Sequence, residues 1–335
     1  MKSKIEPLKY PSMLHCIKLQ AVFSPLSILT IVLIAWLVSP SSTQAQTCPP
    51  ALQTPSAEQI QQAQRNIRNR GYLWKISKDN RSSYLYGTIH LGRFEWIFPG
   101  PNLRAALQAV DVLALELDPL DQQIQTALAT LQQKQQPVPL PPKLRQRLDH
   151  QITASCALPQ TVAHLSPIMQ TVIVSVLRGR FQGLEAAYGQ EVVLSSLARQ
   201  TGKPIVSLET AEIQLSALIP NSTHETLSVL DSMLSQLESG KAERYFLRLA
   251  EIWNTGNLSD LENFQSWCEC AETEIDKRML KRINDDRNSD MAERINALHT
   301  QGKKVLAAVG ALHMTGNQSL PRLMKQRGFT VERIH

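Results

Sequence analysis

Two segments near opposite ends of the chain repeat one pattern, and this repetition constrains the fold more than any other feature. In Tyr84–Gly92 (YLYGTIHLG) and Val305–Gly316 (VLAAVGALHMTG), an apolar run typical of a strand leads into Gly-x-x-His and another glycine. Glycine permits the close turn at a strand end, so each histidine lies at the carboxyl end of its strand. Ligands bind at that edge in open α/β sheets. A single Gly-x-x-His is weak evidence, but the pair predicts one sheet that directs His90 and His313 to a shared site.

Two glutamates occupy matching positions at the ends of two further predicted strands. Glu116 lies just before the carboxyl end of the apolar run Val112–Leu117, and Glu209 directly follows the run Pro204–Leu208. Short, near-continuous apolar runs are typical of buried parallel strands. Burying a carboxylate is costly unless it is ion-paired or bound to a metal. Glu116 is therefore either half of a buried ion pair or a site residue, and we favour the site.

The order of strands and helices predicts an α/β fold. A hairpin of Tyr72–Ser77 and Ser83–Thr88 precedes the buried strands, and a last strand spans Phe329–Ile334. We expect a central mixed sheet formed by both ends of the chain, with a large all-helical insertion at about residues 210–300. The helices expected in the insertion are Thr223–Glu238, Lys241–Trp253, Leu258–Trp267, Glu274–Asp285 and Asp290–Leu298.

The N-terminal residues favour export. The uncharged run Leu26–Val38 follows four lysines and precedes a stretch of small residues that ends at Ala45, which is the order of a secretory signal peptide. An uncleaved anchor is the alternative, because the uncharged stretch extends back to Leu19 and is long enough to span a bilayer. Both alternatives place the domain in the periplasm or outside the cell. The expected parts are a signal peptide at 1–45, an N-terminal arm at 46–70 and the domain at 71–335.

Composition and charge exclude some classes of protein. Of the 335 residues, 43% are hydrophobic and 19% are charged, which is an ordinary globular composition. The net charge is +6, and half of it lies before Ala45, where four lysines face one glutamate. A charge of this size without a basic stripe gives no support for a nucleic-acid partner. The chain also lacks the HExxH, GxSxG, Walker and GxGxxG motifs.

Four cysteines follow the expected signal peptide, namely Cys48, Cys156, Cys268 and Cys270. An even number in an exported chain allows up to two disulfides, and we expect at least one. Cys268 and Cys270 form a Cys-x-Cys pair, which is too tight for easy mutual bridging, so we expect these two to have different partners. A zinc site built from this pair and distant thiols is the alternative.

Together the strand ends supply two imidazoles and two carboxylates, a set suited to Zn, Mn, Co or Fe with open coordination positions. We expect His90, His313 and Glu209 to bind the metal and Glu116 to act as the general base. Such a centre would hydrolyse a peptide or ester bond through an activated water molecule. Without a metal, one histidine would act as the base and a carboxylate would orient it.

These residues also resemble the TraB/PrgY/GumN family, to which the animal Tiki metalloproteases are similar. The motifs appear in the family's order, and the resemblance covers roughly residues 70–334. It implies an α/β core with a helical insertion, and a divalent metal site for Mn, Co or Zn built from the Gly-x-x-His histidines and glutamates. One departure is Met314 after His313, where the family more often has leucine. The resemblance is carried by Tyr86–Gly92, Glu116–Asp118, Leu208–Thr210 with Gln214, Arg287, and Gly310–His313 with Gly316.

The resemblance also implies a role for Arg287. The residues around it favour a solvated arginine at a helix start, whereas the family has an arginine at the site in this position. The planar fork of donors on an arginine suits a carboxylate or an oxyanion. We therefore expect Arg287 to reach the edge of the site and to act with Glu116 in catalysis.

The activity implied by the resemblance is that of a metal-dependent hydrolase, which we expect to be a peptidase with a peptide or protein substrate. The alternative is a non-catalytic periplasmic binding or regulatory protein that sequesters a peptide, haem or a metal. For haem, the candidate ligands are His164, Tyr188 and His224, although each is more simply a surface residue. Contact with a membrane is expected only through an uncleaved N-terminal segment.

Overall fold

The computed structural model describes residues 48–335, and residues 57–335 form the unit that carries the sheet. This unit begins with α1 (Ala57–Arg65). The expected signal peptide and the alternative membrane anchor lie outside the described residues. Within the described part of the chain, no helix combines the length and the apolar character needed to cross a membrane.

The first two strands form the expected hairpin. β1 (Tyr72–Lys78) pairs antiparallel with β2 (Arg81–Thr88) around a two-residue turn. Both turn residues, Asp79 and Asn80, have left-handed φ angles, of 52° and 57°. Tight hairpin turns need such angles, and aspartate and asparagine tolerate them better than most residues do. The hairpin thereby fixes the strand that leads to His90.

Within residues 48–335, β3 (Val112–Leu115), β4 (Ile205–Ser207), β5 (Val305–Gly310) and β6 (Thr330–Arg333) complete one mixed sheet of six strands. The strand order is β4-β3-β5-β2-β1-β6. β2, β3, β4 and β5 run parallel, whereas β1 is antiparallel to both of its neighbours. β5, from the C-terminal part of the chain, lies between β2 and β3. Both ends of the chain therefore build the sheet, which confirms the predicted α/β class.

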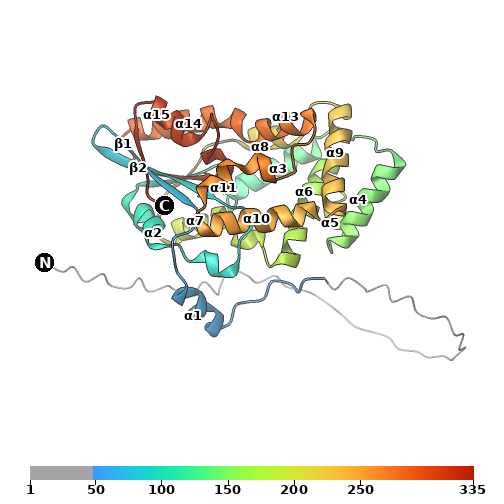
Figure 1. Cartoon of the computed structure of the whole chain (residues 1–335), viewed down its shortest axis with the longest axis horizontal. Coiled ribbons are helices and arrows are strands. Elements are labelled where there is room, and N and C mark those ends of the chain that lie inside the picture. The colour runs from blue at the N-terminus through green and yellow to red at the C-terminus, as the bar shows by residue number, and fades with distance from the viewer. Residues whose placement is uncertain (1–47) are drawn as a thin grey trace, which may run out of the picture. The chain divides into compact units, whose positions relative to one another are not determined.

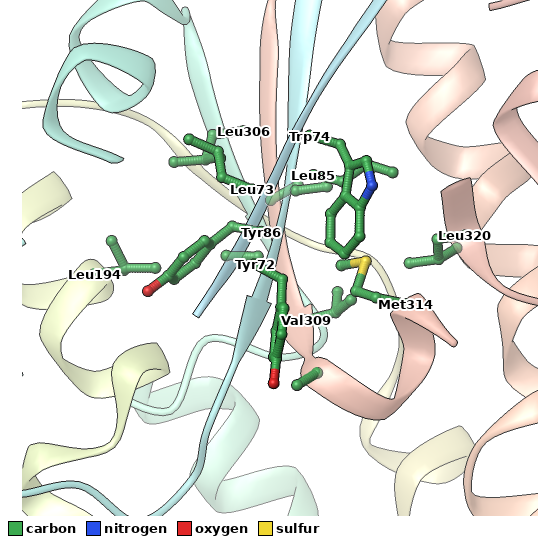
Figure 2. Packing of buried hydrophobic residues seen from close by; sticks show 14 of the residues in the cluster. Tyr72, Leu73, Trp74, Leu85, Tyr86, Leu194, Leu306, Val309, Met314 and Leu320 are labelled. Carbon is green, nitrogen blue, oxygen red and sulfur yellow. The ribbon is translucent and has the colours of Figure 1, made fainter. Parts of the chain in front are cut away.

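The centre of the sheet is buried on both faces, as its near-continuous apolar strands predict. Residues Val305–Val309 of β5 have no exposed surface. Figure 2 shows Leu306 and Val309 of this strand in one cluster with Tyr72 and Tyr86 of the hairpin. Both tyrosine hydroxyls donate to backbone carbonyls, so burial leaves neither of them unpaired. This core holds β2 and β5, and with them the two Gly-x-x-His segments, in a fixed register.

β3 is shorter than predicted, so Glu116 lies one residue beyond the strand rather than inside it. The pairing of β3 with β5 stops at Leu115 and Ala308. Beyond that point the Gly310 N–H donates to the Glu116 side chain instead of to a backbone carbonyl, which ends the ladder. The carboxylate therefore lies at the carboxyl edge of the sheet.

Helices form a second apolar core beside the sheet. α4 (Pro142–Ala154), α6 (Pro167–Gly179) and α9 (Thr223–Glu238) pack against one another through this separate cluster (Figure 1). Helices that precede β4 therefore pack with those of the expected insertion. The other long helices are α2 (Pro101–Ala109), α3 (Gln122–Gln133), α7 (Gln190–Gln200), α8 (Ala211–Leu218), α10 (Lys241–Thr255), α13 (Glu274–Ile283), α14 (Asp285–Thr300) and α15 (Leu320–Gln326).

The bounds of the helices follow their capping residues. α9 has the predicted bounds, because the Ser222 side chain accepts from the Glu225 N–H at the helix start. The predicted helix Leu258–Trp267 is instead divided into α11 (Leu258–Glu262) and α12 (Phe264–Trp267). The Asn263 side chain between them donates to the Ser259 carbonyl, a local bond that competes with a continuous helix.

The predicted pairing of the Cys-x-Cys motif is wrong, because Cys268 and Cys270 are bonded to each other. Glu269 between them has a left-handed φ of 50°, which folds the backbone and brings the two Cα atoms to 5.0 Å. That separation lies within the ordinary range for a disulfide. Cys48 and Cys156 each also take part in a disulfide. The disulfides are compatible with an exported protein.

Candidate functional site

The parallel strands bring the four expected site residues to one edge of the sheet. Glu116 follows β3, Glu209 lies two residues after β4, and His90 and His313 lie two and three residues after β2 and β5. Backbone bonding continues past the strands, since the Glu209 N–H donates to the Glu116 carbonyl. The contacts of the side chains then divide the four residues into two groups.

Glu116 is at the centre of these contacts. Its Oε1 accepts from the Gly310 N–H at 2.7 Å and lies 3.7 Å from Nε2 of His313. Its Oε2 accepts from Arg287 at 2.6 Å and from Gln214 at 3.2 Å. Burial by itself would raise the pKa of Glu116, but the positive charges around it, with the Gly310 N–H, lower that pKa to about 2. Glu116 is therefore an anion at physiological pH.

His313 is buried, and its tautomer follows from its partner. Nδ1 lies 2.6 Å from Oδ1 of Asn288, whose Nδ2 donates to the Gln318 carbonyl. This second bond fixes the orientation of the amide, so its oxygen faces the ring and Nδ1 carries the proton. Nε2, the atom nearer Glu116, then bears the lone pair. Burial lowers the pKa of His313 to about 4, so the ring is neutral near pH 7.

His90 is oriented in the same way by Glu191, a residue of α7. Nδ1 of His90 lies 3.0 Å from Oε1 of Glu191, and the Thr88 hydroxyl donates to the same oxygen. The negative charge of Glu191 raises the pKa of His90 to about 9. The side chain of His90 is 70% exposed, so a ligand can reach Nε2.

Gly310 keeps the space between these groups open. A Cβ atom at this position would lie 3.3 Å from Oε1 of Glu116, 3.5 Å from Cδ2 of His313 and 3.7 Å from Nε2 of His90. Two imidazoles and one carboxylate therefore surround a small shared space beside this glycine. The glycine of the second Gly-x-x-His segment thus provides room as well as a change of chain direction.

The second group joins Glu209 to Arg287. Nε of the guanidinium donates to Oε1 of Glu209 at 2.8 Å, and Nη2 donates to Oε2 of the same carboxylate. Gln214 donates to both Glu116 and Glu209. Arg287 thus lies at the site, with a side chain only 10% exposed, and it contacts both glutamates. Both oxygens of Glu209 are engaged by these donors, so this carboxylate faces Arg287 rather than the histidines.

The residues that orient the two rings were not predicted from the sequence. Glu191 lies 103 positions after Thr88 and near the start of a helix, where an acidic residue is ordinary. Asn288 lies in a polar segment at another helix start. Neither residue belongs to a local pattern. Only the tertiary packing of α7 and α14 beside the ends of β2 and β5 brings them to the histidines.

A cavity of about 330 Å³ adjoins these groups. Its floor consists of the ends of β2, β3 and β5 with the two histidines, Glu116 and Arg287, and its walls are mainly apolar side chains of α10 and α13. Apolar walls around a few polar groups are typical of ligand sites. The candidate haem residues His164, Tyr188 and His224 do not line this cavity.

Among residues 48–335, no three His, Cys, Asp or Glu side chains already stand close enough together to hold a metal ion. The chemistry of the donors nevertheless fits a divalent ion. Each histidine has Nδ1 held by an oxygen acceptor and Nε2 left for a ligand, which is how metal-binding histidines are usually oriented. Glu116 adds an anionic oxygen beside them. His90, His313 and Glu116 are therefore the candidate ligands.

Known proteins resemble this chain along most of its length. Residues 72–333 match the TraB/PrgY/gumN family. The uncharacterized protein YbaP of Shigella flexneri, and that of Escherichia coli K12, are each 24% identical over 277 residues, which cover 77% of this chain and 95% of theirs. Metalloprotease TIKI1 of Danio rerio is 25% identical over 310 residues, which cover 78% of this chain and 62% of that protein. No solved structure matches. Since the matched segment includes every residue of the candidate site, the fold and the comparison agree, and the chain belongs to the TraB/PrgY/gumN family.

Proposed function

We propose that this protein is a divalent-metal-dependent hydrolase that cleaves peptide bonds. The observation that carries the proposal is the space beside Gly310, which two oriented imidazoles and one ionised carboxylate surround. Nitrogen and oxygen donors of this kind suit Mn, Co or Zn. The name metalloprotease, which the relative from Danio rerio bears, supports the same class of reaction, although this chain spans only 62% of that relative.

We assign the carboxylate ligand to Glu116 rather than to Glu209, the ligand predicted from the sequence. Both oxygens of each glutamate accept hydrogen bonds, so these bonds do not separate the two. The difference is that Oε1 of Glu116 lies 3.7 Å from Nε2 of His313, whereas Glu209 faces Arg287. His90, His313 and Glu116 would then hold the ion. A bound metal supplies a Lewis acid and lowers the pKa of a water molecule, so that hydroxide is available near pH 7.

The surrounding residues position this centre. Glu191 and Asn288 fix the tautomer and the direction of the two rings. Arg287 spans both glutamates, so its donors are used within the protein and it acts as a positioning residue for Glu116. Glu116 and His313 at the floor of the cavity are buried, which strengthens their electrostatic interactions, whereas His90 is open to solvent.

We propose that the protein is exported and that residues 1–45 are removed as a signal peptide. The Cys268–Cys270 disulfide supports this location, because disulfides persist in oxidising compartments. N-terminal sequencing of protein recovered from cells tests the proposal, and we expect a mature chain that starts at Gln46. A chain that starts at Met1 in the membrane fraction would favour the uncleaved anchor.

Digestion of a peptide library, read by mass spectrometry, tests the hydrolase assignment. We expect the purified protein to cleave peptides with Mn²⁺, Co²⁺ or Zn²⁺ and not with a chelator. His313→Ala should abolish cleavage, whereas His224→Ala, at an exposed position of α9, should not change it. A protein that binds a metal and cleaves no peptide would refute the hydrolase and favour the binding or regulatory alternative.

A further inference from the structure

Among the residues that the structure describes, no charged side chain lines the walls of the site cavity. The ionisable residues that form its floor are His90, Glu116, Arg287 and His313. A charged ligand group inserted between the walls would therefore lose its hydration and find no counter-charge there. The ionisable groups of the cavity are thus confined to its floor, and its walls are mainly apolar.

Helix α10 forms one of these walls with a single face. Phe246, Leu249 and Trp253 are spaced three and four residues apart, so they lie on one side of the helix and line the cavity together. Leu280 and Ile283 of α13 contribute in the same way. The cavity of about 330 Å³ has the volume of about ten water molecules at roughly 30 Å³ each. That volume exceeds the needs of one catalytic water, so the apolar faces leave room for a substrate group.

We propose that this cavity is a subsite for a large apolar side chain, aromatic or leucine-like, next to the bond that is cleaved. The proposal rests on the function proposed above and names its substrate class as peptides that carry such a residue. A large apolar side chain displaces the water of the cavity and buries its own apolar surface against the walls. Both effects favour binding. A lysine or glutamate side chain has no partner there, and an alanine side chain leaves most of the cavity filled with water.

A second cavity, next to the first, could hold the rest of such a peptide. It has a volume of about 600 Å³ and shares Leu280, Asn284 and Leu312 with the first cavity. Its lining includes polar side chains such as Gln265 and Asn317, which suit the N–H and C=O groups of a peptide backbone. The side chain of one residue would enter the apolar cavity while the backbone continues into the polar one.

A set of alanine pentapeptides tests the subsite, with phenylalanine, leucine, alanine, lysine or glutamate as the central residue. We expect the metal-loaded protein to cleave the phenylalanine and leucine peptides about 10- to 100-fold more efficiently than the other three, as measured by kcat/KM. Leu249→Trp should fill the cavity and remove most of this preference without changing the metal content. The matched control is Leu247→Trp, a half-buried position on the same helix that does not line the cavity, and it should keep the preference.

Binding of the same peptides to the metal-free protein, followed by saturation-transfer NMR, separates this proposal from the hydrolase assignment. Binding of the phenylalanine peptide that Leu249→Trp weakens supports the subsite even if no peptide is cleaved. Cleavage without a preference for large apolar residues would overturn the subsite and leave the hydrolase standing. Neither binding nor cleavage of the phenylalanine peptide would overturn both.

Discussion

Nδ1 of the buried His313 donates to Oδ1 of Asn288 at 2.6 Å, and this contact leaves Nε2 as the ring atom that can accept a ligand. Asn288 has no exposed surface and follows Arg287 on α14. One turn of this helix therefore orients a histidine through Asn288 and contacts two glutamates through the residue before it, Arg287. The geometry of the site depends on how α14 packs beside the end of β5.

Asn288→Ala removes the acceptor that fixes the tautomer of His313. We expect metal affinity to fall about 10- to 100-fold, as for other residues that orient metal-binding histidines. Isothermal titration with Mn²⁺ measures this change, and thermal unfolding shows whether the fold remains. Ser289→Ala, at the exposed neighbouring position, is the control and should bind the metal normally. An unchanged affinity in Asn288→Ala would mean that packing alone orients the ring.

The two histidines should titrate far apart in the metal-free protein. Glu191 raises the pKa of His90 to about 9, and burial lowers the pKa of His313 to about 4. The contribution of His90 to stability is therefore complete below its ordinary pKa of 6.5 and is lost as the pH rises through about 9. The effect of His313 is opposite. As the pH drops from 6.5 towards about 4, the unfolded chain binds a proton at this histidine that the folded chain does not, so the free energy of unfolding falls.

NMR of the ring carbons against pH checks these values. Glu191→Gln should move the pKa of His90 down towards 6.5 and leave that of His313 in place, because Glu191 contacts only the first ring. Two histidines with similar pKa values near 6.5 would show that these contacts do not form in solution.

Arg287→Lys keeps the charge but cannot reproduce the contacts of Arg287 with Glu116 and with both oxygens of Glu209. We expect peptide turnover to fall about tenfold or more, by analogy with the loss of one oriented donor in other active sites. Metal content should not change, since both histidines and their partners remain. Arg278→Lys, in an exposed ion pair with Glu225, is the control and should have no effect. Full turnover in Arg287→Lys would show that Arg287 does not position Glu116 for catalysis.

Gly310→Ala would place a methyl group in the shared space between the histidines and Glu116. The φ of −48° at this glycine is open to alanine, but the added Cβ would lie only 3.3 Å from Oε1 of Glu116, so we expect the free energy of unfolding to change by no more than about 1 kcal/mol in either direction. Metal-dependent cleavage should nevertheless fall about 100-fold, the typical cost of displacing a reacting group by 1 Å. A variant that is stable and fully active would show that the reaction takes place elsewhere.

The site residues that lie at strand ends could be predicted from the sequence. His90, Glu116 and His313 each follow an apolar run at a fixed short distance, and the carboxyl ends of parallel strands share one edge. The fold class follows from the same runs. The position of Arg287 at the site could be predicted only from the family resemblance, because its neighbours in the sequence are those of any helix start.

The features that could not be predicted from the sequence depend on contacts between distant segments or on local details such as one backbone angle or one side-chain hydrogen bond. Glu191 and Asn288 reach the histidines only through helix packing, for which no short motif exists. The Cys268–Cys270 bond depends on the left-handed φ of Glu269, which an ordinary residue adopts rarely and without a sequence signal. The spacing of apolar residues could not distinguish the continuous helix expected at 258–267 from two short helices. The break depends on the hydrogen bond that the Asn263 side chain donates to the Ser259 carbonyl.

The crystal structure of the protein soaked with Mn²⁺, with the metal located by its anomalous scattering, tests the central claim most directly. We expect one strong peak beside Gly310, within about 2.0–2.2 Å of Nε2 of His90, Nε2 of His313 and an oxygen of Glu116. The pair between Arg287 and Glu209 should remain intact in that structure. A peak bound by Glu209 instead of Glu116, or no peak beside Gly310 in crystals that hold Mn²⁺ elsewhere, would contradict the assignment.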